Sequence, residues 1–141
     1  MSETMESKPG ERDPGELAKA MGMVKVVELD AKAGRAVIEY QVGMHMCHSG
    51  GVAQGGFVTG WIDSAMAHAA MAATDFAFVP MSFEIKVSFF RPAVPGVVTA
   101  EGWIERRGRS TLFLEGRLLD ASGEVLAKGT STARLVPRGE V

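Results

Sequence analysis

The sequence predicts an α+β fold in which an antiparallel sheet wraps around one long helix. A segment at residues 54–73 is rich in Ala and Met, poor in charge and free of proline, which is typical of a helix with mostly buried surroundings. Two strand-like segments precede this helix and four follow it. Successive strands joined by hairpins form an antiparallel sheet, and one helix can cover only one face of such a sheet.

The elements before the long helix are separated by glycine-containing breaks. A short helix is expected from Pro14 to Gly22, because proline suits a helix start and glycine a helix end. Strands are expected over residues 23–30 and 35–42, and a loop over residues 43–53 leads into the long helix. Residues 1–13 are polar and charged, so we expect a disordered lead-in followed by a single domain over residues 14–141.

The long helix begins at a double glycine, Gly55 and Gly56, and is expected to fray near Thr74. Its length and apolar character also suit a membrane span. Polar side chains interrupt it, among them Asp63 at mid-span, and a carboxylate is costly in lipid. We therefore predict a buried helix of a soluble protein and no membrane span.

The second half of the chain reads as strands. Apolar and polar residues alternate over residues 81–89, which predicts a strand with one apolar face. A Pro- and Gly-containing break at residues 91–96 follows. Three further strands are expected, separated by hairpin turns, over residues 97–106, 110–120 and 124–136.

Composition narrows the class of function. A hydrophobic content of 46% and a charged content of 23% fit an ordinary soluble domain of 141 residues. The net charge of −2 argues against nucleic acid as the main partner. The single Cys47 cannot form an internal disulfide, which fits a cytoplasmic protein.

Asp63 is the most informative residue of the chain. A carboxylate in a largely buried helix must be paired, protonated or put to use, because desolvating it alone is costly. The free N–H groups at the Gly55 end of the helix can bind an oxygen atom. Eight residues separate these two features, which is roughly 12 Å along a helix. If both act on one bond, they come from different subunits, with the two helices antiparallel across a two-fold axis.

A set of motifs resembles the hot-dog-fold acyl-CoA thioesterases of the phenylacetate-pathway (PaaI-like) and 4-hydroxybenzoyl-CoA group. The resemblance covers residues 23–136 and implies the hot-dog fold and hydrolysis of an acyl-CoA substrate. It also implies no metal or redox cofactor, and a homodimer or a dimer-of-dimers tetramer with sites between subunits. The motifs that carry it are His48-x-x-Gly51-x-x-Gln54-Gly55-Gly56, Asp63-Ser64-Ala65-Met66-Ala67, Val87-Ser88-Phe89-Phe90-Arg91-Pro92-Ala93, Arg107-Gly108-Arg109-Ser110 and Asp120-Ala121-Ser122-Gly123-Glu124.

The resemblance implies a role for each catalytic position. Asp63 is the carboxylate that attacks the thioester or activates water, and the Gly55 N–H binds the thioester oxygen with help from the helix dipole. The Asn or Gln of the family falls on His48, which makes activity depend on pH. The His of the family falls on Gln54, which cannot titrate. Ser82 matches a serine that positions water in some members.

Substrate-binding positions are implied at two places. Gly56 adjoins the Gly55 amide at the helix start. The cationic turn Arg107, Gly108, Arg109 and Ser110 suits the phosphates of coenzyme A, because guanidinium groups bind phosphates in a bidentate manner. A solvated turn with no ligand is the alternative.

Several other interpretations stay open. His45, Cys47 and His48 offer metal ligands, but one short loop without a second cluster is a weak zinc pattern. A Cys47–His48 nucleophilic pair and a functional His68 are also weaker than packing roles. A non-catalytic acyl-CoA-binding module is the second functional hypothesis, with Gln54 as its support. A hydroxyacyl dehydratase ranks lower, because no His-Phe-Pro entry precedes the helix.

Overall fold

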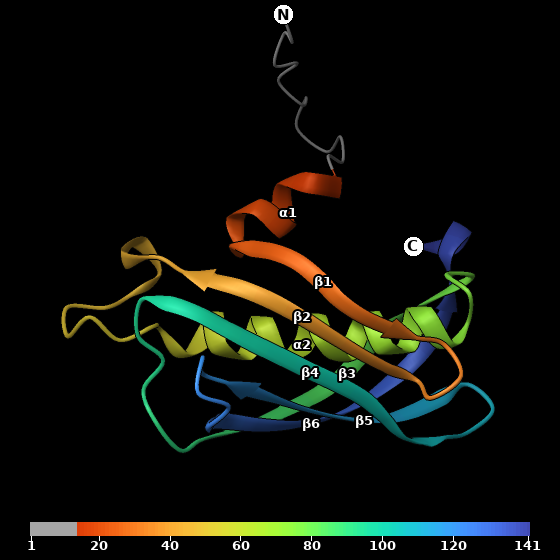
Figure 1. Cartoon of the computed structure of the whole chain (residues 1–141). Helices are drawn as coiled ribbons and strands as arrows, with labels where there is room; N and C mark the ends of the chain where they lie inside the picture. The colour runs from red at the N-terminus through yellow and green to blue at the C-terminus, as the bar shows by residue number, and fades with distance from the viewer. Residues whose placement is uncertain (1–13) are drawn as a thin grey trace, which may run out of the picture.

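The computed structural model describes residues 14–141 as one sheet, one long helix and short flanking elements (Figure 1). The lead-in predicted for residues 1–13 lies outside the described residues. Short 3-10 turns occupy Met44–Met46 and Arg138–Glu140. The main elements are α1 (Pro14–Ala20), β1 (Met23–Asp30), β2 (Arg35–Val42), α2 (Gly55–Ala73), β3 (Phe78–Phe89), β4 (Gly96–Arg107), β5 (Thr111–Leu119) and β6 (Val125–Pro137).

The six strands form one antiparallel sheet in the order β1-β2-β4-β5-β6-β3. Figure 1 shows this sheet curving around α2, with α1 beside the start of β1. The predicted α+β architecture, a hot-dog fold, is therefore confirmed. The strand boundaries agree with the predicted ones to within about three residues, and the largest difference is that β3 begins earlier, at Phe78.

Three glycines allow α2 to lie directly on the sheet. Gly102, Gly116 and Gly129 are register partners on β4, β5 and β6, so they form a row across the sheet. A Cβ atom added at Gly102 would lie 2.4 Å from backbone atoms of Ala65 and Met66. Since real Cβ atoms do not approach that closely, α2 can occupy this position only over glycine.

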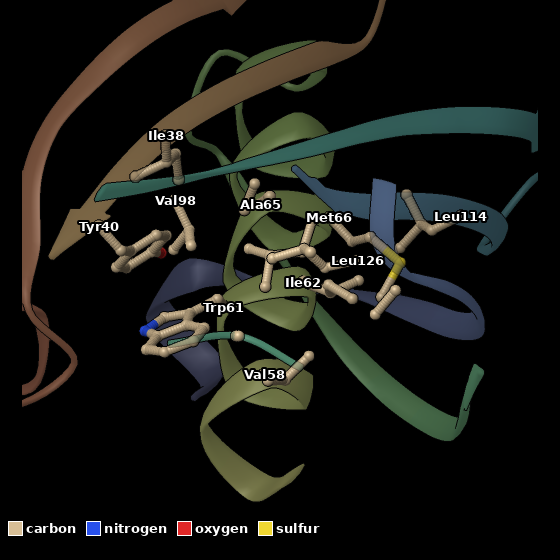
Figure 2. Close-up of a cluster of buried hydrophobic side chains, with 14 of the residues drawn as sticks. Ile38, Tyr40, Val58, Trp61, Ile62, Ala65, Met66, Val98, Leu114 and Leu126 are labelled. Carbon is tan, nitrogen blue, oxygen red and sulfur yellow. The ribbon is translucent and has the colours of Figure 1, made fainter. Parts of the chain in front are cut away.

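The core lies between α2 and the concave face of the sheet (Figure 2). Trp61, Ile62 and Met66 are almost completely buried on the sheet-facing side of α2. The ring of Tyr40 from β2 lies 5.9 Å from the ring of Trp61, centroid to centroid. The Trp61 Nε1–H donates a hydrogen bond of 2.7 Å to the carbonyl oxygen of Met21, which ties α2 to the segment that follows α1.

The apolar face predicted for β3 is present, but the rest of the chain leaves much of it uncovered. Met81, Phe83 and Phe89 are 49%, 67% and 56% exposed, whereas Ile85 and Val87 are half-buried. The reason is topological, because β3 is an edge strand that pairs only with β6. A large apolar surface therefore remains open along this edge of the described chain.

An ionic network on the outer side of the sheet links three neighbouring strands. Glu101 of β4 accepts hydrogen bonds from Arg35 of β2, at 2.6 Å, and from Arg117 of β5. Burial alone would raise the pKa of the Glu101 carboxyl, but the two arginines outweigh burial and lower the pKa. This network stabilises the central strands on which α2 rests.

Candidate active site

Asp63 lies on the face of α2 that points away from the core, and it lines a cavity of about 470 Å³. The cavity is bounded by α2, by α1 and the segment after it, and by the first two strands. From α2 it receives Gly60, Asp63, Ser64, Ala67, His68 and Met71, which recur at helical spacing on one face. The helix thus divides its side chains between the core and this cavity.

The Asp63 carboxylate is half-buried, and among residues 14–141 no cation forms an ion pair with it. Burial raises its pKa above the ordinary value. A carboxylate that is partly desolvated and unpaired is a stronger base and a better nucleophile than a solvated one. The carboxylate is thus partly buried, in line with the expectation that the surroundings of this helix are mostly buried.

The start of α2 offers a free backbone donor. The Gln54 side chain caps the helix, because its Oε1 atom accepts a hydrogen bond of 3.0 Å from the Gly56 N–H. No acceptor within the described part of the chain takes the Gly55 N–H. This N–H is one of the unpaired donors at a helix N-terminus, where the helix dipole favours an oxygen atom with negative charge.

Gly55 lines a second cavity, of about 340 Å³, together with Phe89 and Arg91 at the end of β3. The two cavities have no lining residue in common, so Gly55 and Asp63 face different spaces in one chain. A Cβ atom at Gly55 would lie 3.4 Å from the Phe89 ring, which is ordinary contact. The predicted separation of the two features along α2 is therefore present in the folded chain.

His48 and Ser82 are not brought to either cavity within one chain. His48 is exposed in the loop before α2, and its Nδ1 atom accepts a hydrogen bond of 3.2 Å from the Gly50 N–H. Ser82 is exposed on edge strand β3, opposite Ala133. Within one chain, neither side chain shares a cavity with Gly55 or with Asp63.

The turn between β4 and β5 carries the predicted phosphate-binding positions. Arg107, Gly108, Arg109 and Ser110 are all exposed, and the Gly108 N–H donates a hydrogen bond of 2.8 Å to the carbonyl oxygen of Thr111. Within residues 14–141 neither of these arginines forms an ion pair. Figure 1 shows this turn at the end of the sheet where α2 finishes, away from the start of α2.

Sequence reasoning missed Tyr40 and the contribution of α1 to the Asp63 cavity. Tyr40 lies on the buried face of β2 and is one of the residues around the cavity that Asp63 lines. Leu17, Ala18 and Met21 come from α1 and the segment after it. One signal was present in the sequence, since Tyr40 is the residue with a hydroxyl group in an otherwise apolar strand face.

The loop before α2 shows no metal-binding cluster among the described residues, where no three His, Cys, Asp or Glu side chains converge. Cys47 and His48 have different hydrogen-bond partners. The Cys47 Sγ–H donates to the carbonyl oxygen of Gly43 at 3.6 Å, whereas the His48 Nδ1 atom accepts from the Gly50 N–H. Over residues 14–141, no helix is both long and apolar enough to cross a membrane.

Comparison with known proteins identifies the family. The sequence profile of the Thioesterase superfamily matches residues 50–127, which is more than half of the chain. The chain belongs to the thioesterase superfamily. The matched segment of this superfamily member includes α2 with Gly55 and Asp63, edge strand β3 and the cationic β4–β5 turn.

Individual relatives agree with membership of the thioesterase superfamily. A protein of Saccharolobus solfataricus with the provisional name of an esterase is 34% identical over 105 residues, which is 74% of this chain and 73% of the relative. A phenylacetic acid degradation-related protein from Ralstonia eutropha JMP134, provisionally named a thioesterase, has a TM-score of 0.79 and 26% identity. The match covers 91% of this chain and 95% of that one.

Two further solved structures of phenylacetic acid degradation proteins are similar. A variant of the PaaI protein from Thermus thermophilus has a TM-score of 0.74 and 26% identity, over 84% of this chain and 97% of that one. The Escherichia coli PaaI protein has a TM-score of 0.77 and 20% identity, over 86% of this chain and 84% of that one. The second match supports the hot-dog fold alone.

Proposed function

We propose that this member of the thioesterase superfamily is an acyl-CoA thioesterase, which hydrolyses a fatty or aromatic acyl-CoA to the free acid and coenzyme A. The observation that carries the proposal is the half-buried, unpaired carboxylate of Asp63 on the wall of a largely apolar cavity. Such a cavity suits a hydrocarbon chain, and the carboxylate suits attack on a carbonyl at its mouth. The reaction needs no metal or redox cofactor, since coenzyme A is part of the substrate.

Each site is proposed to combine two subunits. Gly55 and Asp63 line separate cavities, and eight helical residues span roughly 12 Å, so one thioester carbon cannot contact both in one chain. Two α2 helices packed antiparallel across a two-fold axis would bring Gly55 of one chain beside Asp63 of the partner subunit, twice over. Both sites of such a dimer would be equivalent.

Edge strand β3 is the proposed interface, and a second copy of this chain is the proposed occupant. Its unpaired backbone groups and its exposed side chains Met81, Phe83 and Phe89 form an open apolar sheet edge. Pairing β3 with β3 of the partner subunit would cover this edge and continue the sheet. Ser82 would then lie at the interface, near the shared sites. A homodimer, or a tetramer made of two such dimers, satisfies this arrangement.

In the proposed reaction, the Gly55 N–H and the dipole of α2 hold the thioester carbonyl oxygen, and His48 adds a second donor. Asp63 of the partner subunit either attacks the carbonyl carbon or removes a proton from the attacking water, with Ser82 orienting that water. The C–S bond breaks, the thiolate takes up a proton, and the oxygen of water ends in the free acid. Gly56 and the turn at residues 107–110 are proposed to bind the rest of coenzyme A.

The decisive experiment measures release of free coenzyme A thiol from short-chain, long-chain and aromatic acyl-CoAs. We expect Asp63→Asn to reduce turnover by at least about 1,000-fold, because the acid–base or nucleophilic group is lost while the side-chain volume is kept. Binding of the acyl-CoA should stay nearly unchanged. Asp75→Asn is the matched control, since Asp75 is exposed just beyond α2 and lines neither cavity. Full turnover by the Asp63 variant would contradict the mechanism.

A non-catalytic acyl-CoA-binding protein is the second candidate function. The observation in its favour is that Gln54 stands where the family has a titratable histidine. Its side-chain oxygen accepts a hydrogen bond from the Gly56 N–H and so caps α2. Tight acyl-CoA binding without thiol release from any substrate would support this alternative. For either function we propose a cytoplasmic location, where acyl-CoA is made and used.

A further inference from the structure

Two chemically active side chains of α2, Asp63 and His68, line the same cavity and are both half-buried. Within residues 14–141, the Asp63 oxygens have no hydrogen-bond or ion-pair partner, and the Nε2 atom of His68 has none either. Neither the Asp63 oxygens nor this Nε2 atom is closed off from solvent. The other described residues around the cavity carry no charge. The cavity therefore holds one free carboxylate and one free imidazole nitrogen.

The ring of His68 is held in place by its other nitrogen. Its Nδ1 atom lies 2.7 Å from the carbonyl oxygen of Ser64, one turn earlier in α2, and 3.5 Å from the Ser64 hydroxyl oxygen. A carbonyl oxygen only accepts, so Nδ1 carries the hydrogen. In the neutral imidazole the lone pair is then on Nε2. Histidines that act as bases are oriented in the same way, by a hydrogen bond from one ring nitrogen to a fixed acceptor.

Helix geometry places this imidazole near Asp63 but not against it. His68 comes five residues after Asp63, which is about 7.5 Å along the axis of α2. The ring reaches back toward the helix start, since Nδ1 contacts Ser64, the residue next to Asp63. Asp63 and His68 nevertheless form no ion pair with each other in the described chain. They are neighbours on one wall that do not neutralise each other.

Hydrolysis by an attacking carboxylate has two steps with different needs. In the first step, a carboxylate oxygen of Asp63 attacks the thioester carbonyl carbon, the C–S bond breaks and the thiolate leaves, so that the acyl group is joined to Asp63 as an anhydride. In the second step, water attacks the acyl carbon and gives up a proton, and the C–O bond to Asp63 breaks. Asp63 cannot accept that proton, because its carboxylate is held in the anhydride. The second step therefore needs another base in the same cavity.

We propose that His68 is this base, and that Asp63 of the same subunit is the nucleophile. The Nε2 atom takes a proton from the attacking water, whose oxygen becomes part of the free acid, and the Asp63 carboxylate is regenerated. The proton on Nε2 then passes to the thiolate of coenzyme A. The inference rests on the proposed thioesterase function, adds a catalytic residue to it and selects the nucleophilic role of Asp63.

Pre-steady-state release of thiol by His68→Gln tests the assignment, with hexanoyl-CoA or the fastest acyl-CoA of the panel. Glutamine can still donate a hydrogen bond to the Ser64 carbonyl oxygen, but it cannot take up a proton. We expect a burst of about one thiol per site, followed by a steady rate at least about 100-fold below that of the wild type. The value of kcat should fall while kcat/KM stays within about twofold, because kcat/KM reports only the steps up to thiol release.

Two further measurements separate a base from a structural histidine. Hydroxylamine added to His68→Gln during turnover should leave a hydroxamate on Asp63, which mass spectrometry of the peptide detects, because hydroxylamine attacks anhydrides. Free imidazole should raise the steady rate of His68→Ala by about tenfold or more. Pyrazole has the same shape and is a much weaker base, so it should not. His68→Ala also serves as the second variant if His68→Gln does not fold.

His45→Gln is the matched control, because His45 is an exposed histidine in the turn before α2 and lines neither cavity. It should keep the wild-type burst and steady rate. If the wild type releases thiol but His68→Gln keeps its kcat, or loses kcat/KM as much as kcat, the role of His68 is wrong and the thioesterase function stands. Equal rescue of His68→Ala by pyrazole and imidazole would also overturn it. If no acyl-CoA yields thiol with the wild type, both proposals fall.

Discussion

At the scale of single residues, burial of Asp63 predicts the pH dependence of turnover. Its pKa is raised by burial, and only the ionised carboxylate can attack a carbonyl or accept a proton. As pH falls through this raised pKa, kcat/KM should decline, and the decline should begin at a higher pH than an exposed aspartate would give. A pH–rate profile with hexanoyl-CoA measures the acid limb. A limb at the ordinary aspartate pKa would show that the carboxylate is solvated in the working enzyme.

At the scale of elements, the packing of α2 against the sheet depends on the row of three glycines beneath the helix, and Gly102 makes the closest approach. Gly102→Ala would place a methyl group 2.4 Å from the backbone of α2, and neither the helix nor β4 can move aside without losing contacts elsewhere. We expect a loss of about 3 kcal/mol or more in the free energy of unfolding. Gly139→Ala is the control, because that Cβ atom meets nothing within 4 Å and should change stability by less than about 0.5 kcal/mol. Equal midpoints of thermal unfolding for the two variants would contradict this account.

At the scale of the whole molecule, the shared site predicts that two inactive variants restore activity when mixed. Asp63→Asn removes the carboxylate, and Gly55→Pro removes the N–H donor. Proline is tolerated at the first position of a helix, and the preceding Gln54 has the extended conformation that proline requires, with φ −62° and ψ 139°. In a mixed dimer, one site has an intact Gly55 from one chain and an intact Asp63 from the other.

Refolding the two variants together should therefore give about one quarter of the wild-type activity, because half of randomly paired dimers are mixed and each has one intact site. Thiol release from the mixture, compared with each variant alone, measures the recovery. If both groups acted within one chain, every site in the mixture would lack one of them. Mixing would then restore nothing.

Local patterns were sufficient to predict the elements of this fold. Proline-free apolar sequence, alternation and glycine-containing turns act over a few residues, so α2 and the six strands could be predicted from the sequence. The spacing of Gly55 and Asp63 along α2 was also predictable, since helix geometry converts residue number into distance. The uncovered apolar edge of β3 was not, because alternation shows that a strand has an apolar face but not whether anything covers it.

By itself the sequence determined the hot-dog architecture, the long helix at its centre and the two groups on that helix whose chemistry suits thioester hydrolysis. Only the tertiary structure decided that Gly55 and Asp63 open into different cavities, that Gln54 caps α2, and that Tyr40 joins Asp63. The physical reason is that a cavity is made by segments far apart in the sequence. Here α1, β2 and α2 form one only after the sheet has curved around the helix, and no local pattern encodes that contact.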